Sequence, residues 1–306
     1  MAWTVADIPN QTDRTFIVTG ANSGLGLETT AALAAAGGSV IMACRNMEKA
    51  NAAAAEVKKR VPGATLELRE LNLAELSSVR RFAEGVLQDG VSVYGLINNA
   101  GIMAVPQGTT VDGFERQLGT NHFGHFALTG LLLGPIADGG GRVVTVASTA
   151  HKFGAVDFDD LHWNKGYNSW RAYGRSKLAN LLFHFELNRR VAEAGLPVIA
   201  AAAHPGYAAT NLQQSSAKSG NSSFKEWLFN LGNGLLAQSA ADGALPSLYA
   251  ATMEDVVGGD YFGPIGMGEM RGPPTRVGST TRAQNLDDAH KLWQVSVEST
   301  GVTWPF

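Results

Sequence analysis

Short apolar segments alternate with longer helical segments through the first two thirds of this chain. The apolar segments are rich in residues that favour β-strands, whereas the segments between them carry apolar residues at helical spacing. Because a helix follows each strand, this order predicts a parallel sheet with helices on both faces, joined by right-handed crossovers. The expected strands cover residues 15–18, 39–44, 64–71, 91–97, 142–147 and 198–203, and the expected helices cover residues 27–36, 47–60, 76–87, 112–133 and 170–194.

The chain changes character after Pro205, where the regular alternation stops. No linker divides the sequence, so we expect one α/β domain over residues 1–306, built on a doubly wound parallel sheet of about seven strands. The remaining segments are a polar stretch at 213–223, an apolar and aromatic stretch at 224–236, an expected helix at 239–253, a short seventh strand at 260–262, an irregular Gly/Pro-rich segment at about 263–285 and an amphipathic helix at 286–298.

The first expected strand ends in a glycine-rich turn, Thr19-Gly20-Ala21-Asn22-Ser23-Gly24-Leu25-Gly26, and a helix follows it. Glycines in such a turn allow positive φ and leave no Cβ to block a phosphate. The N-terminus of the following helix offers N–H groups and the positive end of its dipole to that phosphate. The spacing differs from the usual G-x-G-x-x-G, so the turn by itself leaves a plain strand–helix connection open.

Several chemically versatile residues follow the expected strands directly. Arg45, Asn98, Ser148 and His204 each stand at the carboxyl end of a strand. Parallel sheets of this kind bind their ligands along that edge. We therefore expect these residues and the glycine-rich turn to line one common edge.

Composition argues against several classes of function. The net charge is −3, charged residues make up only 17% of the chain and no basic tract stands out, so a nucleic-acid partner is not expected. Cys44 is the only cysteine, which excludes an internal disulfide, and no His, Asp or Glu cluster has metal-ligand spacing. The sequence shows neither a signal peptide nor an apolar run long enough for a membrane span. These features predict a cytoplasmic protein without a catalytic metal.

Tyr173 and Lys177 stand four positions apart in an expected helix, so they share one helix face. An ammonium beside a phenol favours the phenolate, and we expect Lys177 to lower the pKa of Tyr173 from its usual value of about 10. A phenol tuned in this way can give or take a proton, although the spacing alone also fits an ordinary surface tyrosine. Ser148, at the end of an apolar strand, can donate to a substrate oxygen, and Asn121 offers hydrogen bonds from inside a helix.

Together these motifs resemble the short-chain dehydrogenase/reductase family. They occur in the family's order between residues 15 and about 212, and a narrower pattern is similar to the retinol dehydrogenase and WW-domain oxidoreductase branch of actinobacterial type. The resemblance implies a Rossmann-type fold. The family motifs are Thr19-Gly20-x-x-x-Gly24-x-Gly26, Asn98-Asn99-Ala100-Gly101, Asn121, Ser148, Tyr173-x-x-x-Lys177 and Pro205-Gly206 with Thr210, and the branch motifs are Thr120-Asn121-His122-Phe123-Gly124-His125-Phe126, Ala150-His151 and residues 173–180.

The resemblance implies a catalytic role for four of these residues. Tyr173 would act as the general acid or base, and Lys177 would lower its pKa and hold the nicotinamide ribose. Ser148 would bind and polarise the substrate carbonyl. Asn121 would support a water that links Lys177 to solvent for proton relay. His122 and His125 are interpreted as helix-packing residues.

The cofactor implied is a nicotinamide dinucleotide, with Pro205, Gly206 and Thr210 on its nicotinamide side. A carboxylate at the end of the second strand would select NAD, but that end carries Arg45, which can pair with a 2′-phosphate. We therefore favour NADP(H) over NAD(H). Asn72 stands where the family usually has Asp, which alters the adenine contact in detail. The cofactor-binding residues implied are Gly20, Asn22, Ser23, Gly24, Leu25, Gly26, Arg45, Asn72, Leu73, Asn98, Ala100, Gly101, Tyr173, Lys177, Pro205, Gly206 and Thr210.

The apolar stretch 224–236 lies where the family builds its variable substrate lid, expected over about residues 207–237. An apolar lid suits a lipophilic aldehyde, ketone or alcohol, but the same stretch could pack on the core or on a second copy in a homo-oligomer. We predict an NADP(H)-dependent oxidoreductase that interconverts a carbonyl and an alcohol by hydride transfer. Two alternatives stay open: reduction of a carbon–carbon double bond, as in protochlorophyllide reductase relatives, and a cofactor-binding sensor without turnover. The sequence does not name the substrate.

Overall fold

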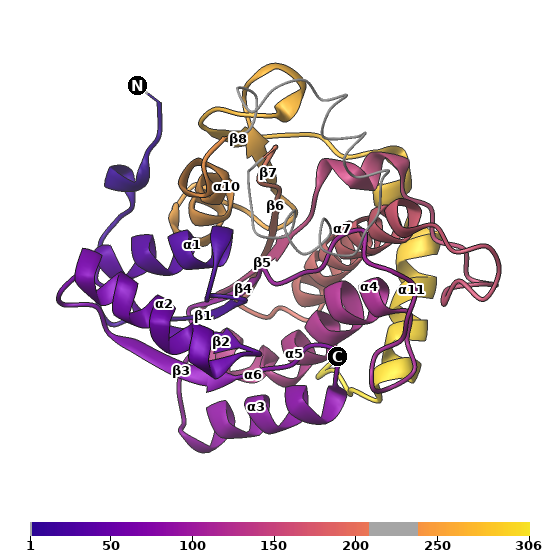
Figure 1. Cartoon of the computed structure of the whole chain (residues 1–306), viewed down its shortest axis with the longest axis horizontal. Helices are drawn as coiled ribbons and strands as arrows, with labels where there is room; N and C mark the ends of the chain where they lie inside the picture. Colours follow the sequence, from indigo (N-terminus) through magenta and orange to yellow (C-terminus); the bar gives the residue numbers. More distant parts are fainter. Residues whose placement is uncertain (1, 208–237) are drawn as a thin grey trace.

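The computed structural model describes residues 2–207 and 238–306, and in these parts of the chain eight strands form one sheet (Figure 1). The strand order is β3-β2-β1-β4-β5-β6-β7-β8, with β1 to β7 parallel and β8 antiparallel to β7. The order reverses between β1 and β4, which opens a crevice at their carboxyl ends. The strands are β1 (Thr15–Thr19), β2 (Ser39–Cys44), β3 (Leu66–Glu70), β4 (Gly95–Asn98), β5 (Arg142–Val146), β6 (Ile199–Ala203), β7 (Tyr261–Pro264) and β8 (Pro274–Arg276).

Helices cover both faces of the sheet, as the alternation predicted (Figure 1). One face carries α1 (Gly24–Ala35), α2 (Met47–Arg60) and α10 (Ala240–Thr252). The other face carries α3 (Leu76–Gln88), α5 (Gly124–Leu131) and α7 (Ser169–Glu193), and α11 (Leu286–Thr300) packs against α7. Shorter elements are η1 (Val5–Asp7), α4 (Arg116–Leu118), η2 (Gly119–Phe123), α6 (Leu133–Asp138), η3 (Thr149–Phe153), η4 (Met267–Glu269) and η5 (Thr281–Gln284).

Two hydrophobic layers sandwich the sheet because successive side chains of a strand point to opposite faces. Phe16 and Val18 of β1 are buried in the layer beneath α1 and α10. Ile17, between them, is buried in the layer that includes Phe126 of α5 and Trp293 of α11. A strand buried on both faces must be apolar throughout, which is why the expected strands read as continuous apolar runs.

An eighth strand lies inside the segment that we expected to be irregular. β8 runs antiparallel to β7, and Phe262 pairs with Arg276 in this hairpin. Proline removes a backbone donor, so Pro274 at the start of β8 is tolerated only because β8 is the edge strand. The Gly/Pro-rich composition that predicted an irregular segment therefore marks a short edge strand instead.

The single helix expected at 112–133 is wrong in detail. It begins at Arg116, widens into a π-helical turn at Gly119–Phe123, and ends at Leu131 before α6. A Cβ on Gly124 would lie 2.4 Å from the carbonyl oxygen of Leu73, so the helix approaches the neighbouring loop closely here. Such π turns interrupt the regular hydrogen bonding of a helix and are frequent at functional sites.

Thr210, the expected lid at about 207–237 and the apolar stretch 224–236 fall wholly or almost wholly outside the described residues. No helix within residues 2–207 and 238–306 is both long and apolar enough to cross a membrane.

Candidate active site

The glycine-rich turn joins β1 to α1 in the conformation that its glycines predicted. Gly20 has φ of 67° and Gly24 has φ of 54°, which residues with a Cβ rarely adopt. A Cβ on Gly26 would lie 2.4 Å from the carbonyl oxygen of Gly20, so only glycine allows α1 to pack this closely on the turn. Ser23 is the N-cap of α1, but its side chain makes no capping hydrogen bond. The first turn of α1 is therefore free of a side-chain cap and points its dipole at this loop.

Part-buried hydrogen bonds attach this turn to the end of β4. The backbone N–H groups of Asn99 and Ala100 each donate to Thr19 Oγ1 at 2.9 Å, and Asn99 Nδ2 donates to Thr19 O at 2.8 Å. His125 Nε2 lies 2.9 Å from Thr19 Oγ1, and its Nδ1 lies 3.0 Å from the backbone oxygen of Asn121. His125, interpreted from sequence as a packing residue, thus links the turn to the π-helical segment.

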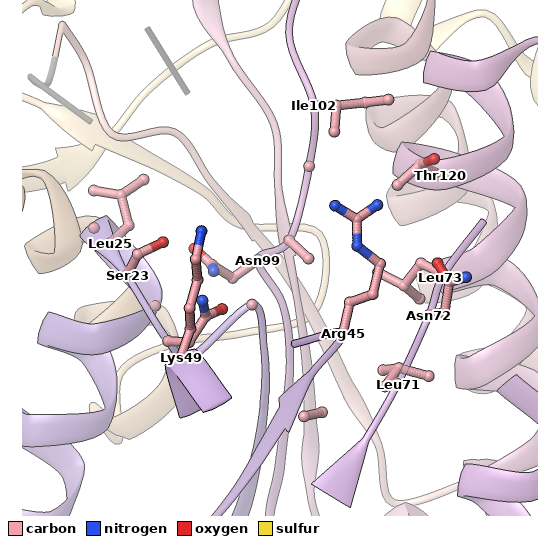
Figure 2. Close-up of a pocket in the computed structure, with 17 residues that line it drawn as sticks. Ser23, Leu25, Arg45, Lys49, Leu71, Asn72, Leu73, Asn99, Ile102 and Thr120 are labelled. Atoms are coloured by element: carbon pink, nitrogen blue, oxygen red, sulfur yellow. The ribbon is translucent and has the colours of Figure 1, made fainter. Parts of the chain in front are cut away.

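A cavity of about 350 Å³ opens at the carboxyl ends of β1 to β4 (Figure 2). Its lining includes the glycine-rich turn and Arg45, two of the features expected at one edge of the sheet. Eleven of the predicted cofactor-binding residues line it, namely Gly20, Asn22, Ser23, Gly24, Leu25, Gly26, Arg45, Asn72, Leu73, Ala100 and Gly101. The sequence reasoning missed six others, Ala43, Lys49, Leu71, Asn99, Ile102 and Thr120.

Two basic residues follow β2 closely: Arg45 comes directly after the strand, and Lys49 lies in the first turn of α2. Figure 2 shows the side chains of Arg45 and Lys49 extending in the same direction, and both line the cavity. Asn46, between them, caps α2 by accepting a hydrogen bond of 2.8 Å from the N–H of Lys49. Neither Asp nor Glu is among the residues that line this cavity. The spacing Arg45-x-x-x-Lys49 across a helix start is the sequence signal that could have identified Lys49.

Lys177 of α7 and Asn121 of the π-helical turn both lie close to Gly101, in the loop after β4. Lys177 is buried on α7 and donates from Nζ to Val146 O at 2.9 Å. The Asn121 side chain exchanges two hydrogen bonds with the backbone of Ile102, and its Nδ2 also donates to Ser176 Oγ. A Cβ on Gly101 would lie 3.2 Å from Asn121 Oδ1 and 3.6 Å from Lys177 Nζ. The expected relay residues therefore lie together, beside the loop that lines the cavity.

Ser148 and Tyr173 lie together at the end of β5. Ser148 caps η3 by accepting from Ala150 N, and its hydrogen bond with Tyr173 lowers the pKa of the phenol. Burial acts the other way and is stronger, so the pKa of Tyr173 rises to about 12. The expected lowering by Lys177 is wrong for this arrangement, because Nζ lies 5.9 Å from the phenol ring centroid and faces Val146. Burial also lowers the pKa of Lys177 to about 8.

Other predicted residues lie outside this cavity. Asn98 is buried beneath it and donates to Thr129 Oγ1 at 2.9 Å. Pro205 and Gly206 follow β6, where Pro205 O accepts a 2.5 Å hydrogen bond from Gln238 Nε2. Their contact with a cofactor stays a prediction.

A small apolar cluster surrounds the face of Tyr173. Met103, Ala104 and Ala150 are buried with it, and Trp170 packs at its edge. The rings of Trp170 and Tyr173 meet edge to face, with centroids 6.4 Å apart. Tyr173 therefore lies in apolar surroundings.

Metal-ligand geometry is absent from the parts of the chain that the structure describes. No three side chains among His, Cys, Asp and Glu come together there in a way that could hold a metal ion.

Comparison with known proteins gives consistent matches. The chain matches the family model for short chain dehydrogenases over residues 14–220. It is 40% identical to human retinol dehydrogenase 13 over 296 residues, which cover 95% of this chain and 86% of that protein.

Two solved structures are also similar to this chain. The crystal structure of an uncharacterised protein from Mycobacterium paratuberculosis is 45% identical, covers 100% of both chains and has a TM-score of 0.82. A protein described as an NAD(P)-dependent gluconate 5-dehydrogenase from Beutenbergia cavernae, with bound NADP, shares the fold at 24% identity with a TM-score of 0.62. That match covers 80% of this chain and 92% of that protein.

Proposed function

Because this chain belongs to the short-chain dehydrogenase family, in its retinol dehydrogenase-like branch, we propose that it interconverts a lipophilic aldehyde or ketone and the matching alcohol with NADP(H). Oxidoreduction at CH–OH or C=O groups with NAD(P)(H) follows from the family itself. The cofactor preference, the substrate class and the residue roles are our proposals. The observation that carries them is the group formed by half-buried Ser148 with buried Tyr173 and Lys177, beside the same sheet edge as the glycine-rich cavity.

The described residues fit a dinucleotide with a 2′-phosphate. The glycine-rich turn lines the cavity, and the start of α1 offers backbone N–H groups for a pyrophosphate. Arg45 and Lys49 would hold the 2′-phosphate by charge-assisted hydrogen bonds. A carboxylate that would repel that phosphate is missing from the lining of this cavity. A dinucleotide bound here supplies or accepts the hydride.

Tyr173 supplies the proton in the proposed reaction. With its pKa raised to about 12 by burial, the phenol stays protonated at neutral pH. A protonated phenol donates from Oη to a carbonyl oxygen as that oxygen gains negative charge, and it recovers a proton in the reverse direction. Ser148 lies within hydrogen-bond reach of the phenol and would donate to the same oxygen.

Lys177 and Asn121 would support this proton transfer from the side of α7 and the π-helical turn. Lys177 Nζ, held by Val146 O at 2.9 Å and 5.9 Å from the phenol ring centroid, would hold the nicotinamide ribose beside the proposed acid. Asn121 Nδ2 donates to Ser176 Oγ, which donates to the backbone oxygen of Tyr173. These bonds fix the relative placement of the two helices that carry the proposed acid and relay.

An apolar wall supports a lipophilic substrate. Tyr173 is packed among Met103, Ala104, Ala150 and Trp170. A carbonyl group brought to the phenol would therefore meet apolar side chains and little water. Relatives in this branch are named retinol dehydrogenases, and retinol is a lipophilic alcohol. We therefore expect the substrate to be a long-chain or isoprenoid-like aldehyde or alcohol rather than a sugar or a small hydroxy acid.

The test is a panel of aldehydes, ketones and alcohols, graded from short and polar to long and apolar, with NADPH and NADH followed by absorbance. We expect turnover with NADPH at a lower KM than with NADH, and kcat/KM that rises with chain length. Tighter binding of NADH would refute the cofactor assignment. Best activity on short polar substrates would refute the substrate class.

A further inference from the structure

A charged residue that the proposed reaction does not use lies close to the Pro205–Gly206 turn. Glu269 belongs to η4, in the connection between β7 and β8. Its Oε2 lies 3.1 Å from Nε2 of His204 and 3.2 Å from Nζ of Lys152. Lys152 stands in η3, the short helix that Ser148 caps. One carboxylate therefore contacts both the residue after β6 and the helix that Ser148 caps.

His204 connects that carboxylate to the backbone of Gly206. The imidazole is fully buried, and its Nδ1 accepts a 3.1 Å hydrogen bond from the Gly206 N–H. A backbone N–H can only donate, so Nδ1 is the unprotonated nitrogen, and Nε2 is the nitrogen that lies 3.1 Å from the Glu269 carboxylate without the alignment of a hydrogen bond. One imidazole ring thus separates the carboxylate from the peptide expected on the nicotinamide side.

The surrounding backbone holds this arrangement in one geometry. Gly263 has no room for a side chain, because a Cβ there would lie 2.1 Å from His204 Nε2. Tyr207 N donates at 2.8 Å to the backbone oxygen of Met270, the residue after Glu269. Glu269 itself has φ of 58°, a left-handed conformation that is uncommon for residues with a side chain. Backbone strain of this kind persists where the surroundings enforce it, as they do at functional sites.

We propose that Glu269 is a positioning residue that acts through His204 on the nicotinamide side, and that its charge makes the site favour the oxidised cofactor over the reduced one. This inference rests on the proposed function, since it takes Gly206 as a cofactor contact. The oxidised nicotinamide ring is a cation and the reduced ring is neutral, so a nearby carboxylate attracts only the oxidised ring.

The carboxylate carries its charge at neutral pH. The contact with His204, followed by the hydrogen bond from Lys152, holds the pKa of Glu269 at about 2, although burial acts in the opposite direction. Lys152 opposes the effect of the carboxylate, but its side chain is 45% exposed, so water screens it more than it screens Glu269 at 26%. We therefore expect the carboxylate to outweigh the ammonium on the Gly206 side of His204.

The experiment measures the dissociation constants of NADP⁺ and NADPH by titration calorimetry for the wild-type protein, Glu269→Gln and Lys152→Gln. A unit charge screened by protein and water and acting across one imidazole ring should change affinity about three- to tenfold. We expect E269Q to raise the Kd of NADP⁺ by that factor and to change the Kd of NADPH by less than about twofold. K152Q removes the opposing charge and should shift the ratio of the two constants the other way.

Asp255→Asn is the matched control, because it removes a surface carboxylate that pairs with Arg276 at 3.1 Å. It should leave the ratio of the two constants unchanged. Equal weakening of both cofactor forms in E269Q would show a structural role only and would overturn the proposal. If E269Q does not fold, the direction of the shift in K152Q decides the question. A wild-type protein that binds neither form would overturn the proposed function, and this proposal with it.

Discussion

Three buried histidines should make the folded state sensitive to mild acid. His122, His125 and His184 are at most 2% exposed, and burial lowers their pKa values to about 3, about 4 and about 4. The unfolded chain titrates them near 6.5. Below pH 6.5 the unfolded state binds protons that the folded state does not bind. The contribution of these histidines to stability is therefore nearly full above pH 6.5 and is lost as the pH falls towards 4.

The size of the loss follows from proton linkage. While the folded histidine stays unprotonated, each unfolded histidine stabilises the unfolded state by about 0.2 kcal/mol at pH 7 and about 1.4 kcal/mol at pH 5.5. The three together should cost about 4 kcal/mol between these pH values, a large share of the roughly 5–15 kcal/mol that stabilises a domain. Burial also lowers the pKa of His151 and His162, which adds to the trend, whereas burial raises the pKa of Glu115 and opposes it.

Urea unfolding at pH 7.0 and pH 5.5, extrapolated to water, measures this difference. His122→Gln should lower stability at both pH values because it removes buried packing, including the contact with Ser296 at 2.8 Å. The same variant should reduce the pH-dependent difference by about a third, which loss of packing alone would not do. A difference below about 1 kcal/mol in the wild-type protein would refute the reasoning.

Three variants and one control test the proposed site. Tyr173→Phe should lower kcat by about 10² to 10⁴ with the Kd of NADPH unchanged, and near-normal activity would rule out the phenol as the proton donor. The double variant Arg45→Ala/Lys49→Ala should weaken NADPH binding about 100-fold and NADH binding by less than about twofold, so equal losses would contradict a 2′-phosphate contact. Gly26→Ala places a Cβ 2.4 Å from a backbone oxygen and should cost about 1–3 kcal/mol and most dinucleotide affinity, whereas Gly63→Ala, with nothing within 4 Å, should be nearly neutral in calorimetry and denaturation.

The sheet and the glycine-rich turn could be predicted because local pattern determines them. A strand buried on both faces must be apolar along its length, so residues such as Phe16, Ile17 and Val18 reveal β1 without reference to the rest of the chain. The positive φ values of Gly20 and Gly24 likewise follow from residue type and position between a strand and a helix.

Features that depend on contacts between distant segments could not be predicted in this way. The π-helical turn at Gly119–Phe123 changes helical spacing by little, yet it places Asn121 against Ile102. The hairpin of β7 and β8 brings Glu269 to His204, and no periodicity in a Gly/Pro-rich segment indicates that contact. Lys49 lies between these cases, because its distance from Arg45 is local but its orientation towards a cavity is not.

The acid–base residues show how burial changes the meaning of a local pattern. Spacing on one helix brings Tyr173 and Lys177 close, but the same burial that excludes water from both raises the pKa of the phenol and lowers that of the amine. Burial disfavours the charged form of both groups, so the pKa of each residue is not determined by the other residue alone. The hydrogen bond from Ser148 is the interaction in this structure that lowers the phenol pKa, and Ser148 comes from the end of β5. Control of proton transfer therefore depends on how the sheet edge meets α7, and a substitution that shifts η3 should alter the pH dependence of the reaction without touching Tyr173 or Lys177.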